Sequence, residues 1–400
     1  LKEYHSVVQN FSIYDVIVVD ESQDFAPPFL EICYEMLDDN KRLIYAYDEL
    51  QNLNSQSLPS PEEIFGSDEY GNPREIIKND ENQKNDIILE RCYRNSKPVL
   101  TTAHALGFGI YRKPNSSLNT GLVQIFENNN LWLDVGYDIQ HGELKAGKPV
   151  VLERTEKTSP SFLIDKLQSD DVIKFKSFDS SLEQAEWVAN EIIKNLKEDE
   201  LRADDIIVIN PDPLTTKNNV GTIRRILFRN NINSHLTGVD TSQDDFFNED
   251  NDSITFTGIY RAKGNEAGMV YVIHADDCYG HSNESNASIA TNRNRLFTAI
   301  TRSKAWVRVV GVGKNMDNLI EEFEQVKSNN YKLSFVYPTE EQKEKIKKIN
   351  RDVSEQEKQV IDETSNILNK FISGIQTKNL FIEDLPPEIL EALRNEINKS

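Results

Sequence analysis

The residues with the clearest chemical potential are two acids that follow an unbroken apolar run. Val16–Val19 lead directly into Asp20 and Glu21. Such a run predicts a strand of a parallel sheet that is covered on both faces, and ligands bind at the carboxyl ends of such strands. Asp20 can hold a magnesium ion there, and Glu21 can orient or deprotonate a water. The alternative is a strand that ends in a solvated acidic turn.

A second acid occupies a similar position, and a glutamine follows it. Residues 41–48 predict a strand that ends in Asp48, and Gln51 comes three residues later. A glutamine at this point can contact a γ-phosphate or its attacking water. Three further segments place arginine, lysine and glutamate beside predicted strands and helices. They are Glu90–Asn95, Thr257–Glu266 and Asn294–Lys304.

The elements around these segments alternate between strands and helices. The predicted strands cover residues 13–20, 41–48, 87–89, 122–126, 149–152, 205–210, 253–256, 269–273 and 306–312. The predicted helices cover residues 27–37, 96–106, 183–193, 222–230 and 292–301. This alternation predicts an α/β protein with two open, mostly parallel sheets flanked by helices. From Pro338 the chain is highly charged, and residues 340–376 predict one long helix or a helical pair.

Composition limits the possible classes. The 400 residues are enough for two or three cores, and an apolar content of 38% with 9% aromatic residues indicates a globular protein. No apolar run approaches the roughly 18 residues that span a membrane. With a net charge of −21, the protein is not expected to bind nucleic acid non-specifically over its whole surface. A local basic groove could still bind a strand. Three isolated cysteines indicate a reducing, cytoplasmic compartment and no cysteine metal site.

Taken in order, the five segments resemble motifs II, III, IV, V and VI of superfamily 1 helicases of the UvrD/Rep type. The resemblance covers most of residues 13–312, and its most specific part is the sequence Ala299–Lys304. It implies RecA-like motor domains. Residues 1–90 would end the first of these domains, and residues 91–337 would form the second without a large accessory insertion. Residues 338–400 would be a helical C-terminal extension able to recruit a protein partner.

The resemblance also assigns roles around a triphosphate. Asp20 would ligate magnesium, and Glu21 would activate the water. Gln51 would sense the γ-phosphate, while Arg94 and Arg302 would reach it from the second domain. Acids on one sheet and arginines on another would complete the site only when the two close, which couples ATP to movement along a strand.

Other roles implied by the resemblance concern the nucleoside and the nucleic acid. Tyr93 would stack on the adenine. Gly264 and Glu266 would lie at the nucleotide, with Glu266 on the ribose. Tyr260 stands where the family usually has a histidine that faces the nucleic-acid strand. Four nearby basic residues read as possible surface charge only: Arg293, Arg295, Lys304 and Arg308.

One expected motif is missing. No GxxxxGK[ST] sequence, the phosphate-binding loop that precedes motif II in this family, occurs in the 400 residues. Either the chain is the carboxyl-terminal part of a larger helicase, which the non-methionine start favours, or the site is degenerate. The leading hypothesis is an ATP- and Mg²⁺-dependent DNA helicase or translocase. One alternative is a non-catalytic helicase-like module that binds nucleotide, nucleic acid or a protein partner. Another is a nucleic-acid-binding regulator whose affinity for a strand does not change with ATP analogues.

Overall fold

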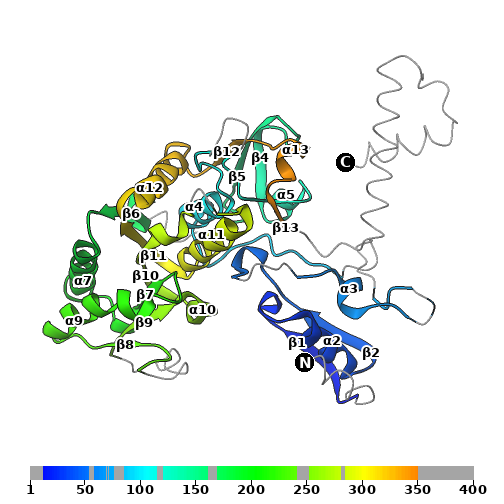
Figure 1. Cartoon of the computed structure of the whole chain (residues 1–400), viewed down its shortest axis with the longest axis horizontal. Helices are drawn as coiled ribbons and strands as arrows, with labels where there is room; N and C mark the ends of the chain where they lie inside the picture. The colour runs from blue at the N-terminus through cyan, green and yellow to red at the C-terminus, as the bar shows by residue number, and fades with distance from the viewer. Residues whose placement is uncertain are drawn as a thin grey trace. The chain divides into compact units, whose positions relative to one another are not determined.

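The computed structural model describes most of the chain before residue 350 (Figure 1). The described residues are 12–53, 58–68, 70, 72–75, 85–114, 120–160, 169–240, 252–280 and 284–349. The chain divides into two compact units, Leu1–Leu58 with Ile87–Arg351 and Pro59–Asp86 with Asp352–Ser400. In the described part of the second unit, one helix forms, α3 (Pro61–Phe65). None of the helices in the described ranges has the length and apolar content needed to cross a membrane.

The centre of the first unit is a six-stranded parallel sheet in the order β6-β11-β10-β7-β9-β8. In that order the strands are Ile173–Phe178, Ser303–Val312, Ala267–Val272, Ile206–Asn210, Ile254–Gly258 and Ser234–Leu236. Val270 of β10 lies opposite Ile207 on one side and Val307 on the other. The predicted α/β class, with parallel strands flanked by helices, is therefore confirmed.

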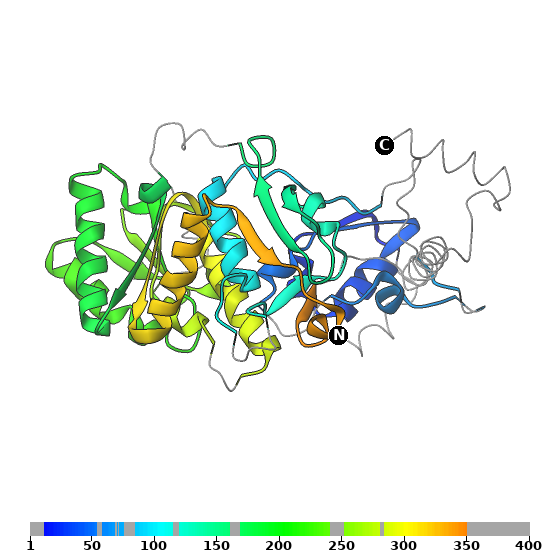
Figure 2. The ribbon, with the colours of Figure 1, turned by 90° about the horizontal axis from the view of Figure 1, so that it is seen from above.

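Helices cover both faces of this sheet. On one face lie α7 (Ser181–Lys197) and α9 (Gly221–Arg229). On the other, α4 (Lys97–Phe108), α11 (Asn286–Ile300) and α12 (Gly313–Ser328) pack side by side (Figure 2). Pro98 in the first turn of α4 suits a helix start, because its missing N–H would have no partner there.

The period of two along β7 explains this three-layer arrangement. Ile206 and Val208 pack into the cluster with α7 and α9, whereas Ile207 and Ile209 pack into the cluster with α4, α11 and α12. Each of these four side chains is at least nine-tenths buried. A strand whose two faces are both apolar must be covered on both sides.

Three smaller sheets complete the first unit. β1 (Tyr14–Val19) pairs in parallel with β2 (Leu37–Tyr45), and α2 (Pro27–Glu35) connects them. An antiparallel sheet has the order β12-β5-β4, with strands Leu333–Val336, Pro149–Arg154 and Tyr137–Gly142. The last sheet pairs β13 (Lys347–Ile349) with β3 (Gln124–Phe126) in parallel. The short helices are α5 (Leu131–Asp134), α6 (Ser169–Val172), α8 (Thr216–Asn219), α10 (Ile259–Ala262), α13 (Glu340–Lys343), η1 (Ser22–Asp24), η2 (Glu49–Gln51), η3 (Ala203–Asp205) and η5 (Ala275–Cys278).

Three predictions from the apolar pattern were wrong. The first strand is not covered on both faces, since Val16 and Val18 are 44% and 68% exposed and β1 pairs only with β2 among the described strands. Residues 87–89 form no strand, and Ile87 and Leu89 are exposed. Residues 340–349 do not continue a long helix, because α13 ends at Lys343 and β13 joins the sheet with β3. The remainder of the predicted 338–400 extension lies outside the described residues, and the division into three domains at residues 90/91 and 337/338 stays a prediction.

A buried histidine links α4 to β4 and gives the core a predictable response to acid. His104 Nδ1 lies 2.8 Å from the Tyr137 hydroxyl, and its ring stacks on Phe297. Burial, with a further contribution from the Arg154 charge, lowers the pKa of His104 from 6.5 to about 3. The neutral His104 therefore contributes to the unfolding free energy at a pH above the pKa that this histidine has in the unfolded chain. The contribution is lost as the pH falls below that pKa, because His104 then binds a proton in the unfolded chain but not in the folded one.

We expect the wild-type chain to lose about 2 kcal/mol more unfolding free energy than a His104→Gln variant when the pH falls from 7.5 to 5.0. Urea unfolding followed by circular dichroism at the two pH values measures the difference. His141→Gln, which changes an exposed histidine, is the matched control and should behave as wild type. Equal pH dependence in wild type and His104→Gln would contradict the assignment.

Candidate nucleotide site at the sheet edges

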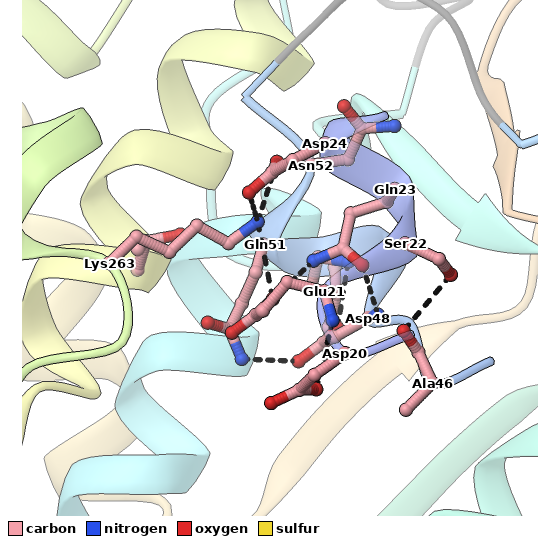
Figure 3. A network of polar contacts seen from close by, with 12 residues as sticks. Asp20, Glu21, Ser22, Gln23, Asp24, Ala46, Asp48, Gln51, Asn52 and Lys263 are labelled. Carbon is pink, nitrogen blue, oxygen red and sulfur yellow. Dashed lines mark hydrogen bonds and ion pairs between the residues drawn. The ribbon is translucent and has the colours of Figure 1, made fainter. Parts of the chain in front are cut away.

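The two acids of motif II lie where β1 ends. Glu21 has φ 53°, in the left-handed region, and turns the chain into η1. Ser22 holds this turn against the end of β2, since its N–H and its Oγ donate to the Ala46 carbonyl at 2.8 and 3.0 Å. The Asp20 carboxylate is exposed and accepts the Glu21 N–H at 2.8 Å (Figure 3). A left-handed non-glycine residue is uncommon, and such positions cluster at functional sites.

A hydrogen-bonded chain runs from motif II into motif III. Gln23 Nε2 donates to Glu21 Oε2 at 2.6 Å, and Gln23 Oε1 accepts the Asp48 N–H at 3.1 Å. Asp48 Oδ2 in turn accepts from Gln51 Nε2 at 2.8 Å, while Oδ1 accepts the Leu50 N–H. Burial raises the pKa of Asp48, although the hydrogen bonds from Gln51 and Leu50 oppose this effect. The side-chain amides thus hold both acids in fixed positions.

Arg302 from motif VI joins the same chain of contacts. One of its terminal nitrogens donates to Gln51 Oε1 at 2.7 Å, and its Nε donates to the Thr298 carbonyl at 3.2 Å. The side chain is 2% exposed. Burial and the neighbouring Arg94 lower the pKa of Arg302 to about 10, with Glu21 and Asp48 acting in the opposite direction. The guanidinium therefore remains charged at neutral pH and lies next to the predicted γ-phosphate sensor.

Motifs IV, V and VI meet at Glu266. This carboxylate forms ion pairs with Arg94 Nε and with Lys304 Nζ, the latter at 3.1 Å. Burial alone would raise the pKa of Glu266, but the Lys304 hydrogen bond and the Arg94 charge outweigh it and lower the pKa. The two predicted nucleotide residues Arg94 and Glu266 are thus brought together, and Lys304 is a partner of this pair rather than surface charge alone.

Lys263 connects motif V directly to motif II. Its Nζ lies 2.8 Å from both oxygens of Asp24 and 3.3 Å from Glu21 Oε2 (Figure 3). The side chain is 5% exposed. Sequence analysis predicted no role for this lysine. The neighbouring Gly264 has φ 82°, a backbone conformation that favours glycine.

Asn294 is a second residue that sequence analysis missed. Its Nδ2 donates to the carbonyls of Glu49 and Asn52 at 3.2 and 2.9 Å, and its Oδ1 accepts from Gln124 Nε2 at 2.7 Å. The side chain is fully buried. It therefore fixes the segment around Gln51 against the motif VI helix. Its position at the start of the fifth segment was the available signal.

The two remaining predicted site residues, Tyr93 and Tyr260, take no part in the hydrogen bonds and ion pairs described above. Tyr93 is 72% exposed, and its hydroxyl accepts a hydrogen bond from Arg91, which raises the pKa of that arginine. Tyr260 on α10 is 50% exposed. Both rings are thus open to a stacking partner. Of the four basic residues read as surface charge, Arg293 and Arg308 are buried instead, at 0% and 8% exposure.

The donor set fits magnesium and a triphosphate. Mg²⁺ keeps several waters in such sites and needs only one or two carboxylates besides the phosphate oxygens. Asp20, exposed at the strand end with Glu21 beside it, meets this requirement. No cluster of three or more potential metal ligands occurs in the described ranges. Phosphoryl chemistry also needs positive charge near the phosphates, which Arg302, Arg94 and Lys263 can supply.

A comparison with protein-family models agrees with the assignment of motifs V and VI. Residues 253–310 match the family model of the UvrD-like helicase C-terminal domain. No curated protein matches the sequence. Among solved structures, the C-terminal domain of a possible DNA helicase from Lactobacillus plantarum WCFS1 is similar at 18% identity over 38% of this chain and 78% of that chain, with a TM-score of 0.26. The matched residues include motif V and the motif VI helix, so the chain contains a UvrD-like helicase C-terminal region, as these motifs predicted.

Proposed function

We propose that this chain is part of an ATP-dependent DNA helicase or translocase of superfamily 1. The observation that carries the proposal is the contact between Gln51 and Arg302, two predicted γ-phosphate ligands separated by 251 residues of sequence. The Lys263 contacts with Asp24 and Glu21 join the same two regions. Surfaces that meet through complementary charge can exchange those contacts for the anionic phosphates of a nucleotide.

Five residues of this chain would have separate roles in ATP hydrolysis. Asp20 would hold Mg²⁺, and Glu21 would orient the attacking water and accept its proton. Gln51 and Arg302 would exchange their mutual hydrogen bond for contacts with the γ-phosphate, while Arg94 would add positive charge. Bound ATP with magnesium supplies the phosphoryl group and neutralises part of its charge. Breaking and remaking these contacts would couple the hydrolysis cycle to motion between the two sheets.

The nucleoside would be held by residues that are now exposed or paired. Tyr93 would stack on the adenine, and Glu266 beside Gly264 would bind the ribose. Tyr260 would contact the DNA strand, since an exposed aromatic ring can stack on any base. These assignments rest on the motif positions and on the exposure of both rings.

We infer that the phosphate-binding loop comes from another segment of the parent protein, because the 400 residues contain no GxxxxGK[ST] sequence. We expect this chain alone to show no ATP hydrolysis above background, whereas the parent should show activity stimulated by single-stranded DNA. A coupled-enzyme assay with and without oligonucleotide measures both. Glu21→Gln in the parent should abolish the activity. Robust ATPase activity of the isolated chain would refute the missing-loop inference, and a parent inactive in all conditions would refute the motor.

The missing loop also favours one alternative, a non-catalytic module that keeps the helicase fold to bind nucleotide, nucleic acid or a partner. Such a module would bind a strand with an affinity that ATP analogues do not change. The motor predicts instead that a non-hydrolysable analogue shifts the strand affinity of the parent. Fluorescence anisotropy of a labelled oligonucleotide with and without the analogue distinguishes the two.

A further inference from the structure

A small cavity lies in the first unit at the amino end of α11, the helix that carries motif VI. It has a volume of about 150 Å³, and its polar lining comes from three distant segments: Arg112 and Thr120, Asn286, and Gln342 with Lys345. This is about half the lower limit for a drug-sized or nucleotide ligand, but it is several times the volume of one water. The cavity therefore suits a small ion.

Arg112 brings to this cavity a positive charge that meets the face of the Tyr279 ring, with the guanidinium carbon 5.5 Å from the ring centroid. Its side chain is 6% exposed, and its Nε is buried without a hydrogen-bond partner. Among the residues that the structure describes, no carboxylate lies within ion-pair distance of Arg112. Among its charged neighbours, Arg293 disfavours the charge of Arg112, and the charge of Arg293 is itself met by both oxygens of Glu322 at 2.7 and 3.0 Å. A buried guanidinium that has an aromatic ring but no ion-pair partner among the described residues is costly, so an anion in the cavity would be favoured.

The other groups around the cavity point to the same sign of ligand. Lys345 is exposed and forms no ion pair within the described ranges. Asn286 is the first residue of α11, which has 15 residues, and the N–H groups of a helix amino terminus attract anions. Asn286 Nδ2 donates to the Lys345 carbonyl and so fixes the two segments together.

Acidic groups near the cavity are already engaged. Glu284 accepts from Ser288 Oγ and Asn292 Nδ2, both at 3.2 Å. Burial and Arg293 lower the pKa of Arg112, and Tyr279, Glu322 and Glu284 oppose this only in part. The nearby carboxylates therefore do not replace a ligand.

We propose that Arg112, Lys345 and the amino end of α11 bind a phosphate-type oxyanion at a site separate from the nucleotide site. The ligand would be free inorganic phosphate or one backbone phosphate of a nucleic-acid strand, which share this chemistry. The inference does not depend on ATP hydrolysis or on the proposed motor function.

The test is a titration of the 400-residue chain with sodium phosphate against sodium chloride at constant ionic strength. Calorimetry gives the Kd, and thermal melting gives the shift in Tm. We expect saturable binding and a rise in Tm with phosphate only. Lys345→Glu and Arg112→Gln should each weaken phosphate binding at least tenfold. Lys314→Glu, which reverses an exposed lysine of α12 that does not line the cavity, should leave it within twofold.

These variants separate the site from other effects. Arg112→Gln removes a buried charge that has no ion-pair partner among the described residues, so this variant should fold in phosphate-free buffer. If Arg112→Gln does not fold, the phosphate affinity of Lys345→Glu, a change at an exposed residue, tests the proposal. Phosphate bound at the nucleotide site would survive both changes. Phosphate acting no differently from chloride, or undiminished binding to Lys345→Glu and to any folded Arg112→Gln, would overturn the proposal. Displacement of phosphate by a single-stranded oligonucleotide would assign the anion to a strand, and its absence would assign a free ion.

Discussion

Replacing Arg302 by glutamine in the parent protein is expected to slow ATP hydrolysis by about 10³- to 10⁵-fold, the range for loss of an arginine finger. The reason is electrostatic. Arg302 is buried, charged at neutral pH and already directed at Gln51, so its charge would act on the developing oxyanions with little screening by water at the guanidinium itself. Steady-state ATPase assays at saturating single-stranded DNA measure the effect on kcat.

A control is needed because Arg302 also contributes to packing. Glutamine keeps a donor for Gln51, and the melting temperature of the variant reports whether the fold is retained. Arg225→Gln changes an exposed arginine of α9 by the same chemistry and should leave kcat within twofold. A folded Arg302→Gln protein that keeps more than a tenth of the wild-type rate would show that this arginine does not stabilise the transition state.

The largest stability effect is expected at a buried ion pair between α11 and α12. Both terminal nitrogens of Arg293 contact the Glu322 carboxylate, and the two side chains are 0% and 3% exposed. Glu322→Gln should lower the unfolding free energy by about 3–5 kcal/mol, because it leaves a buried guanidinium without its counter-charge. Urea unfolding followed by circular dichroism measures the loss.

Two further variants test the cause. The double change Arg293→Met with Glu322→Leu should recover most of the loss, since an apolar pair of similar volume avoids burying any charge. The Lys327–Asp170 pair, 37% and 58% exposed, is the matched control, and Lys327→Gln should cost less than about 1 kcal/mol. If Glu322→Gln costs no more than the control, the buried pair does not stabilise the domain as argued.

Much of the central sheet was predictable because its strands and helices are strongly patterned. Residues 205–210 became β7 and residues 183–193 lie within α7, since continuous apolar runs and a 3.6-residue period each fit one kind of element. The α11 helix was predicted too short, by six residues at its start, because half of the residues in Asn286–Thr291 are polar and the segment lies partly on the surface. The strand at residues 347–349 was missed because three residues carry no period, and only pairing with β3 makes them a strand.

The site divides in the same way. The residues alone suggested Asp20, Glu21 and Gln51 as candidates, and the resemblance to the helicase motifs added Arg94 and Arg302, whose positive charge phosphoryl transfer can use. Neither could identify Lys263 or Asn294, whose partners Asp24 and Asn52 lie more than 200 residues away.

By itself, then, the sequence determined the class of the central sheet and the motifs of a UvrD-like C-terminal region, since both depend on local periodicity and residue type. Only the tertiary structure decided which charges are paired. Arg293 and Arg112 look alike in the sequence, but Arg293 lies against Glu322, whereas Arg112 lines a cavity with Lys345 and Asn286. Electrostatic pairing depends on distance and burial, and the packing of remote segments sets both.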